Sequence, residues 1–190
     1  MLLVTACGHA QRGAITRPRD LVDLTLTANQ IVQGRVVAVA VDNHSEYKNI
    51  KILSLTLALD DVLKGSAGTT VTLHQFLWDI RDISDGAGYR VGDEVLLFLN
   101  KPTSLGLTSP VGLEQGRFRV SRGDNAEYFA VNGSQNAGLF RDPIASGSLK
   151  LPKLTARSRA SIQSFSHGAI PLSALKESVH LLLGTPGVAK

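Results

Sequence analysis

The sequence is poor in cysteine, with Cys7 alone among 190 residues. A single thiol cannot form an intrachain disulfide or supply a cysteine-based zinc site. Aromatic residues make up only 5% of the chain, and one of them is a tryptophan. No apolar run reaches the ~18 residues that a membrane-spanning helix needs. These shortages argue against a disulfide scaffold, a cysteine-ligated zinc module and a helical membrane span within this sequence.

Excess charge of one sign is also scarce, since the net charge is +4. Many of the basic residues fall in two segments that we expect to be flexible, 12–19 and 150–159. A nucleic-acid-binding face usually interleaves Lys and Arg with aromatic residues on strands, and that pattern is missing here. We therefore expect no nucleic-acid partner.

Motifs for catalysis or cofactor binding are absent. Gly112–Gly116 has the glycine spacing of a nucleophile elbow but contains no serine, and it precedes a strand. Gly86–Gly92 does not have the G-x-G-x-x-G spacing of a dinucleotide site. No two of the five histidines have the H-x-x-x-H spacing of metal ligands. His74, near Asp79 and Asp82, is the best metal-ligand candidate, but it more simply fits a surface histidine.

The acidic pairs Asp60-Asp61 and Asp93-Glu94 do not predict a carboxylate site either. Adjacent residues on a strand point to opposite faces of the sheet, so the two carboxylates of each pair diverge. We accordingly expect no catalytic residue, no cofactor and no metal, and we expect that the chain is not an enzyme.

What the sequence does have is two long aliphatic runs near its beginning. The first covers 31–41 and contains Gly34, which indicates a bulge or bend. The second covers 50–59 and continues to Lys64, with Leu53, Leu55, Leu57 and Leu59 alternating with smaller residues. Period-2 alternation between polar turns predicts two paired strands with the leucine face buried.

The remaining segments can be added to this hairpin in chain order. Asp20 predicts the N-cap of a helix over 21–28. Further strands are expected over 69–76, 94–99, 111–120 and 128–132. The run Glu94–Leu99 is continuously apolar, so both its faces should be covered. A C-terminal helix should start at a Ser173 cap and end at Leu183.

Together these elements predict a mainly β fold, with four segments. Residues 1–19 would be a truncated export signal and tether, and 20–132 a five- or six-stranded antiparallel barrel of OB type. Residues 133–170, rich in Ser, Gly, Arg and Lys, would form an extended arm. Residues 171–184 would be the C-terminal helix, packed on the barrel.

The first ten residues suggest export. Val4-Thr5-Ala6-Cys7 resembles a bacterial lipobox, in which the cysteine is lipidated and becomes the mature N-terminus. The usual basic start and apolar core of 7–15 residues are not present, which an upstream start site would explain. Two alternatives are cleavage after Ala10, which removes Cys7, and a short apolar N-terminus with no targeting role. Lipidation of Cys7 would anchor the chain in a membrane, because each buried CH₂ contributes about 0.8 kcal/mol.

Several of these stretches resemble a known group of proteins. They are the strand region 28–37, Val62-Leu63-Lys64-Gly65, the segment 91–99 and Gly116–Val120. This pattern is similar to exported bacterial proteins of unknown function. It is more remotely similar to netrin-like and tissue-inhibitor-of-metalloproteinases domains, which are OB-type barrels. Those inhibitors chelate zinc through a disulfide-bonded N-terminal cysteine. Here Cys7 lacks a partner and an acylated amine cannot bind a metal, which argues against inhibition by that route.

The loop Leu77–Arg90 is the candidate partner-binding segment. Phe76, Trp78 and Tyr89 lie in or beside it, and exposed aromatic side chains often bind partners. A plug over the end of the barrel is the alternative for these aromatics. The sequence therefore predicts a non-enzymatic binding module, exported to the periplasm or anchored at the outer membrane through Cys7, with a protein partner in the envelope. A hydrolase inhibitor or regulator is the alternative, and the oligomeric state is open.

Overall fold

The chain folds into one antiparallel sheet flanked by helices. The computed structural model describes residues 17–77 and 86–184. In these residues seven strands form a single sheet in the order β3-β2-β1-β4-β5-β6-β7. The strands are β1 (Gln30–Asn43), β2 (Lys51–Lys64), β3 (Thr70–Phe76), β4 (Glu94–Leu99), β5 (Arg117–Arg122), β6 (Tyr128–Asn132) and β7 (Ile170–Pro171). The helices are α1 (Leu21–Thr27), α3 (Arg141–Ala145), α4 (Ala156–Gln163) and α5 (Leu172–Leu182). The mainly β prediction is confirmed.

The predicted pairing of the two aliphatic runs is also confirmed. β1 and β2 pair antiparallel from Ile31↔Lys64 to Asn43↔Lys51, and the register shifts at Gly34. A Cβ on Gly34 would lie 2.3 Å from the carbonyl oxygen of Ala58, so the strands can approach this closely only at a glycine. Leu53, Leu55 and Leu57 are fully buried, as the alternation predicted, whereas Leu59 at the end of the same face is only partly buried.

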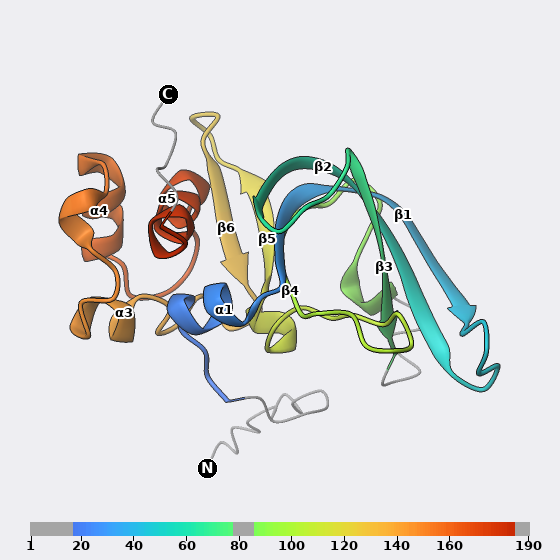
Figure 1. Ribbon diagram of the computed structural model, residues 1–190. Coiled ribbons are helices and arrows are strands. Elements are labelled where there is room, and N and C mark those ends of the chain that lie inside the picture. The colour runs from blue at the N-terminus through green and yellow to red at the C-terminus, as the bar shows by residue number, and fades with distance from the viewer. Residues whose placement is uncertain (1–16, 78–85, 185–190) are drawn as a thin grey trace, which may run out of the picture.

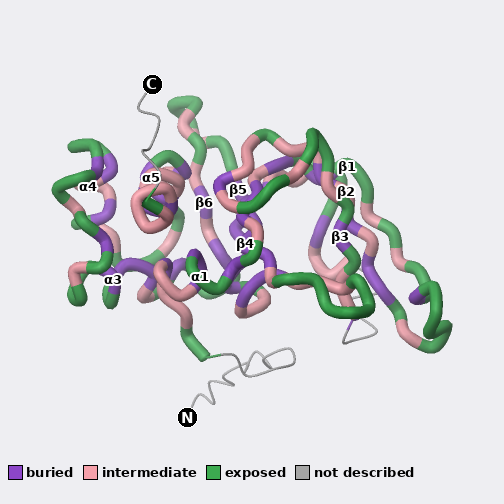
Figure 2. Tube along the Cα trace, in the orientation of Figure 1, coloured by how far each residue is buried: buried purple, intermediate pink, exposed green. Residues whose placement is uncertain are grey.

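The core has two parts, one on each face of β4. Leu96 and Phe98 belong to the cluster under the helices, whereas Val95, Leu97 and Leu99 belong to the cluster inside the curl of β1, β2 and β3. Both faces of this strand are therefore covered, as its continuous apolar run predicted. Figure 2 shows the buried residues running through the middle of the molecule, while the outer end of the β1–β2 hairpin is exposed.

The sheet is not the closed barrel of five or six strands that we predicted. β5 and β6 extend the sheet beyond β4 and towards the helices, and no ladder among the described strands joins them to β3 (Figure 1). The edge of β3 is met instead by the segment 100–110, where the Thr108 N–H donates to the His74 carbonyl at 2.8 Å. The physical reason is that the apolar inner face of α5 needs a surface to cover it, and β5 and β6 provide one.

The predicted extended arm over 133–170 contains regular structure. It holds α3, α4, a short 3₁₀ turn at Leu151–Lys153, and β7, which pairs with β6. Buried Leu149, Leu154 and Ile162 pack it into the helical side of the core. Its serines and glycines were misleading, because the few apolar residues between them are enough to dock short helices against the rest of the fold.

The remaining element boundaries are close to the predictions. Asp20 caps α1 by accepting a hydrogen bond from the Asp23 N–H at 2.7 Å. The strand predicted over 111–120 is shorter, because Leu113–Gln115 forms a 3₁₀ turn after Gly112 and β5 begins at Arg117. α5 starts one residue before the predicted cap, with Pro171 at its N-cap position, so Ser173 lies within its first turn.

Candidate functional site

Of the predicted partner contacts, only two can be placed in the structure. Cys7 and Trp78 lie outside the described residues, as does most of the loop Leu77–Arg90. Phe76 ends β3 and is half-buried. Tyr89 is only 4% exposed and belongs to the cluster inside the curl of the sheet. Its ring therefore does not offer a surface for a partner.

The Tyr89 ring packs against the guanidinium of Arg117. The Arg117 guanidinium carbon lies 4.4 Å from the centroid of the Tyr89 ring. Arg117 is itself buried, and it donates to the Ala87 carbonyl at 2.6 Å and to the Glu114 carboxylate at 2.8 Å. Burial of the Tyr89 ring raises its pKa above the ordinary 10.0. The two hydrogen bonds of Arg117 and its contact with the Tyr89 ring fasten the segment 86–89 to β5.

The histidines do not gather into a site. Among the described residues, no three His, Cys, Asp or Glu side chains are placed to hold a metal ion. His74 is exposed on β3, and Asp79 and Asp82 lie outside the described residues. Histidines were expected at surface or half-buried positions, but His44 is buried, with only 4% of its surface exposed. Its Nδ1 accepts from the Glu46 and Tyr47 N–H groups, so Nε2 carries the proton and donates to the Leu105 carbonyl at 3.2 Å.

Two serine–histidine contacts occur on the surface. The Ser54 hydroxyl lies 3.1 Å from Nδ1 of His74, and the Ser166 hydroxyl lies 3.0 Å from Nδ1 of His167. Within the described part of the chain, no carboxylate is hydrogen-bonded to either imidazole. A nucleophile–base pair needs such a third group to orient the base. A small cavity of about 270 Å³ adjoins His74, between β3 and the segment 100–110.

The adjacent acidic residues have different surroundings: Asp60 and Asp61 lie on β2, whereas Asp93 precedes β4 and Glu94 begins it. Asp61 forms an ion pair with Lys176, and Asp60 is exposed. Asp93 accepts from the Arg90 N–H at 3.0 Å, and Glu94 accepts from Arg35 at 3.0 Å.

A concavity lies between α5, α4, the β5–β6 hairpin and the β1–β2 hairpin. Its volume is about 900 Å³. We call it the α5 groove. It is lined by Gln33, Asp61, Ala126, Glu127, Tyr128, Thr155, Arg157, Ser158, Leu172, Ser173, Lys176, Glu177 and His180. Side chains from distant parts of the sequence therefore meet at one place.

One wall of the α5 groove is joined to the sheet by Lys176. Its ammonium forms an ion pair with Asp61 on β2 and donates to the Gln33 amide oxygen on β1 at 3.0 Å. The Lys176 and Asp61 side chains are 24% and 38% exposed. The contact thus fixes α5 over the start of the β1–β2 hairpin while leaving both groups accessible to a ligand.

The opposite wall is joined by Arg157 and Glu127. Arg157, at the start of α4, donates to the Glu127 carboxylate at 2.9 Å, beside the β5–β6 turn. The Arg157 side chain is 75% exposed, so solvent screens this pair and it contributes little to stability. The pair does neutralise both charges at this wall of the groove.

Between the walls, Glu177 of α5 caps α4. Its carboxylate accepts from the Thr155 N–H at 2.6 Å and from the Thr155 hydroxyl at 2.9 Å. Burial raises the pKa of Glu177, but hydrogen bonds from Ser158 and Thr155 outweigh this and hold it below the ordinary 4.5. The carboxylate is therefore ionised at neutral pH and is held in place from the α4 side.

Two side chains give the groove open contact surface. Tyr128 at the start of β6 is 41% exposed, and Ser173 of α5 is also exposed. Figure 1 shows α5 beside β6, with α4 on the outer side of α5. The groove thus combines an aromatic ring, hydroxyl groups and neutralised ion pairs.

The sequence analysis missed this site, although part of its signal was present. Ser173, Lys176, Glu177 and His180 follow the i, i+3, i+4, i+7 spacing of one helix face. That spacing identifies a polar stripe on α5. It does not reveal that β1, β2, β6 and α4 stand opposite the stripe.

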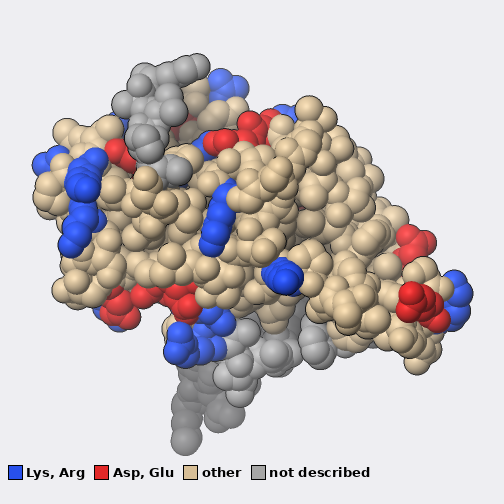
Figure 3. Space-filling model, in the orientation of Figure 1, with Lys and Arg blue, Asp and Glu red and all other residues tan. Residues whose placement is uncertain are grey.

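The surface charge is mixed on the face shown in Figure 3. Basic and acidic side chains are scattered there, often beside one another, and most of the area is uncharged. Next to the N-terminal segment, Arg17 and Arg19 both pair with Asp23, at 3.0 and 3.1 Å. This face therefore presents no large field of one sign. None of the described helices has the length and apolar character needed to cross a membrane.

Comparisons of this chain with protein-family models, with curated proteins and with solved structures gave no match. The resemblance to exported bacterial proteins and to netrin-like domains therefore stays a prediction from the sequence.

Proposed function

We propose that this protein is a non-enzymatic binding module of the bacterial envelope that holds a polar ligand in the α5 groove. The observation that carries the proposal is the convergence of polar side chains from β1, β2, β6, α4 and α5 around a volume of about 900 Å³. Ligand sites of small molecules typically occupy about 300–1,000 Å³. The export and lipid anchoring of Cys7 rest on the sequence pattern Val4-Thr5-Ala6-Cys7.

A binding role fits the groove better than a reaction. Catalytic acids and bases need a carboxylate or imidazole free to exchange a proton with the substrate. In the groove, Asp61 and Glu127 are engaged in ion pairs, and Glu177 is ionised and held by the N-terminus of α4. Groups held in this way are suited to hydrogen-bond a ligand in a fixed orientation.

The alternative of a hydrolase inhibitor has less support. It depended on the loop Leu77–Arg90, whose described aromatic residue, Tyr89, is buried under Arg117. We therefore place the contact surface in the α5 groove and not on that loop.

The compartment can be tested by expression of the gene in a Gram-negative host. We expect the product to partition with membranes and to carry lipid, and we expect the Cys7→Ser variant to lose the lipid and the membrane association. A wild-type product that is unmodified and cytoplasmic would contradict the export proposal.

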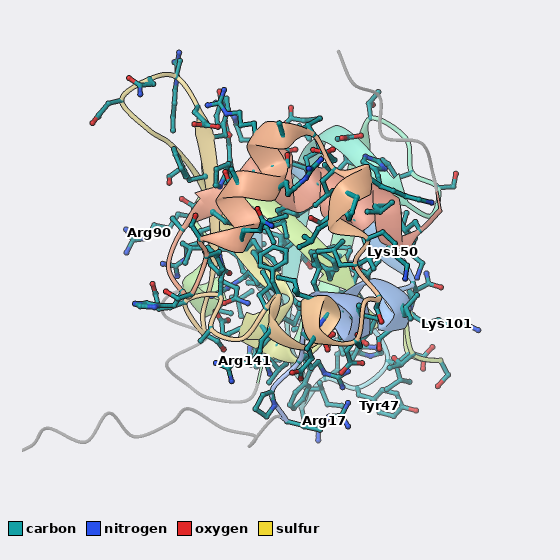
Figure 4. The ribbon with its side chains drawn as sticks, turned by 90° about the vertical axis from the view of Figure 1, so that its left-hand side faces the viewer. Arg17, Tyr47, Arg90, Lys101, Arg141 and Lys150 are labelled. Atoms are coloured by element: carbon teal, nitrogen blue, oxygen red, sulfur yellow. The ribbon has the colours of Figure 1, made fainter. Side chains whose placement is uncertain are left out.

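The groove can be tested in the same cells with a diazirine amino acid in place of Ser173. The matched control places it at Lys101, whose side chain points into solvent away from α4 and α5 (Figure 4). On illumination we expect an adduct of defined mass at position 173 and not at position 101. Equal labelling at both positions, or none at either, would overturn the assignment of the groove as a binding site.

A further inference from the structure

The charges in the α5 groove restrict what it can bind. Asp61 is neutralised by Lys176 and Glu127 by Arg157. Glu177 is satisfied by donors at the N-terminus of α4, where the helix dipole adds positive potential. A strongly charged ligand would have to compete with the partly buried Lys176–Asp61 pair and leave one of its charges without a partner, which is costly. The Arg157–Glu127 pair adds little to this cost because Arg157 is exposed. A neutral ligand avoids that cost.

The polar groups that remain favour hydroxyl groups on the ligand. A carboxylate that accepts one ion-pair hydrogen bond keeps further lone pairs, and Ser173 and the Gln33 amide supply donors and acceptors along the groove. A ligand hydroxyl can donate to a carboxylate and accept from a serine or lysine at the same time. Few neutral ligands offer many such groups in a rigid array, and saccharides are the main class that does.

Tyr128 supplies the apolar contact that a sugar ring needs. Its ring is 41% exposed at the mouth of the groove, whereas Leu172, the large apolar side chain that also lines it, is 6% exposed. An aromatic ring with a polar tip packs against the C–H face of a pyranose while the hydroxyl groups at the sugar's edge bind polar neighbours. A peptide would need several apolar pockets for its anchoring side chains. Among the described residues that line the groove, Tyr128 is the one exposed aromatic side chain.

We infer that the α5 groove binds a neutral oligosaccharide, with one sugar ring stacked on Tyr128 and its hydroxyl groups bonded to the paired charges of Lys176–Asp61 and Arg157–Glu127. The volume of about 900 Å³ is at the upper end for small-molecule sites, which suits an oligosaccharide more than a single sugar. This inference rests on the proposed function and specifies its ligand.

The test is titration of the ¹⁵N-labelled full chain with neutral cellotetraose, maltotetraose and chitotetraose. Tetragalacturonate is the charged probe of the same size, and tetra-alanine is the peptide probe. We expect at least one neutral sugar to shift the amide signals of Tyr128, Ser173 and Lys176, and tetragalacturonate and tetra-alanine to leave them unchanged.

The variant series separates stacking from mere loss of structure. Tyr128→Ala should weaken sugar binding about tenfold, equivalent to about 1.4 kcal/mol, while Tyr128→Phe should keep affinity within about twofold because the ring remains. Tyr47→Ala is the matched control. Tyr47 is 46% exposed and lies at the far end of the β1–β2 hairpin, away from α4 and α5 (Figures 1 and 4).

The outcomes distinguish this inference from the proposed function. Groove shifts with tetragalacturonate or tetra-alanine alone would overturn the saccharide inference and leave the binding module standing. Sugar binding that is insensitive to Tyr128→Ala would overturn the stacking site. No shift with any probe, together with a specific adduct at position 173 in cells, would also reject the saccharide and keep the proposed function. Loss of that adduct would reject both.

Discussion

Glu177 and Thr155 hold the two C-terminal helices together. The Glu177 carboxylate on α5 accepts from both the N–H and the hydroxyl of Thr155, which is the N-cap of α4. Thr155 in turn accepts from the Ser158 N–H at 3.3 Å. One carboxylate thus satisfies free donors at the beginning of α4 and, through its position on α5, sets the distance between two walls of the groove.

Replacing this carboxylate should loosen α4. We expect Glu177→Ala to lower the free energy of unfolding by about 1 kcal/mol, the usual effect of losing a helix cap, and Glu177→Gln to lower it by less because an acceptor remains. Urea denaturation of both variants checks this. Glu46→Gln is the control, since Glu46 is exposed on the β1–β2 turn. An effect of Glu177→Ala no larger than that of the control would show that the cap is not stabilising.

The same contact predicts a dependence of stability on pH. The pKa of Glu177 in the folded protein lies below 4.5, and that of Asp23, despite its burial, is lowered below 3.8 by Arg17, Arg19 and Thr27. A lowered folded pKa stabilises the protein fully above the unfolded pKa, and this stabilisation is lost as the pH falls through the folded pKa.

The difference in unfolding free energy between the wild type and Glu177→Gln should therefore stay constant from about pH 7 to about pH 5 and shrink towards about pH 3. Urea titrations at several pH values measure it. A difference that grows as the pH falls would have the wrong sign for an ionised, hydrogen-bonded carboxylate.

Removal of the Arg117 guanidinium should leave the Tyr89 ring and the Ala87 carbonyl without their partner. We expect Arg117→Ala to destabilise the protein by about 2 kcal/mol, because the Tyr89 ring and the Ala87 carbonyl lose a shared buried partner, whereas the exposed Glu114 carboxylate can be solvated instead. Hydrogen exchange at 86–89 should rise in parallel. Arg119→Ala, two residues along the same strand at an exposed position, should change stability by less than about 0.5 kcal/mol. Similar losses of stability in both variants would contradict the conclusion that Arg117 and Tyr89 fasten the segment 86–89 to β5.

The close approach of β1 and β2 should make Gly34 intolerant of any side chain. In Gly34→Ala the new Cβ would meet the Ala58 carbonyl oxygen at 2.3 Å, so the strands must separate. Overpacking of this kind costs about 1–3 kcal/mol. Thermal unfolding measures the loss. Gly68→Ala, whose Cβ would have no atom within 4 Å, should be neutral or slightly stabilising. Equal melting temperatures for the two variants would refute the packing argument.

The local patterns of the sequence were sufficient for the strands and for one helix cap. The alternation of Leu53, Leu55 and Leu57 predicted a buried face, and the run Glu94–Leu99 predicted a strand covered on both sides. Asp20 predicted the start of α1. These features depend on the preferences of neighbouring residues, which periodicity and capping express directly.

The error over residues 133–170 has a different origin. α3 and α4 are short, and isolated helices of such length are marginal in water. They exist because Leu149, Leu154 and Ile162 dock on a core made by distant residues, and because Glu177 caps α4 from another helix. No local pattern contains those contacts.

By itself, the sequence determined the β-rich class, the pairing of β1 with β2 and the polar stripe on α5, since each follows from residue order within one segment or two adjacent ones. Only the tertiary structure decided that the sheet stays open, that Tyr89 is buried under Arg117, and that Lys176 and Arg157 reach Asp61 and Glu127 to form a groove. These features join residues far apart in the chain, so they depend on how whole elements pack and not on the preferences of any one segment.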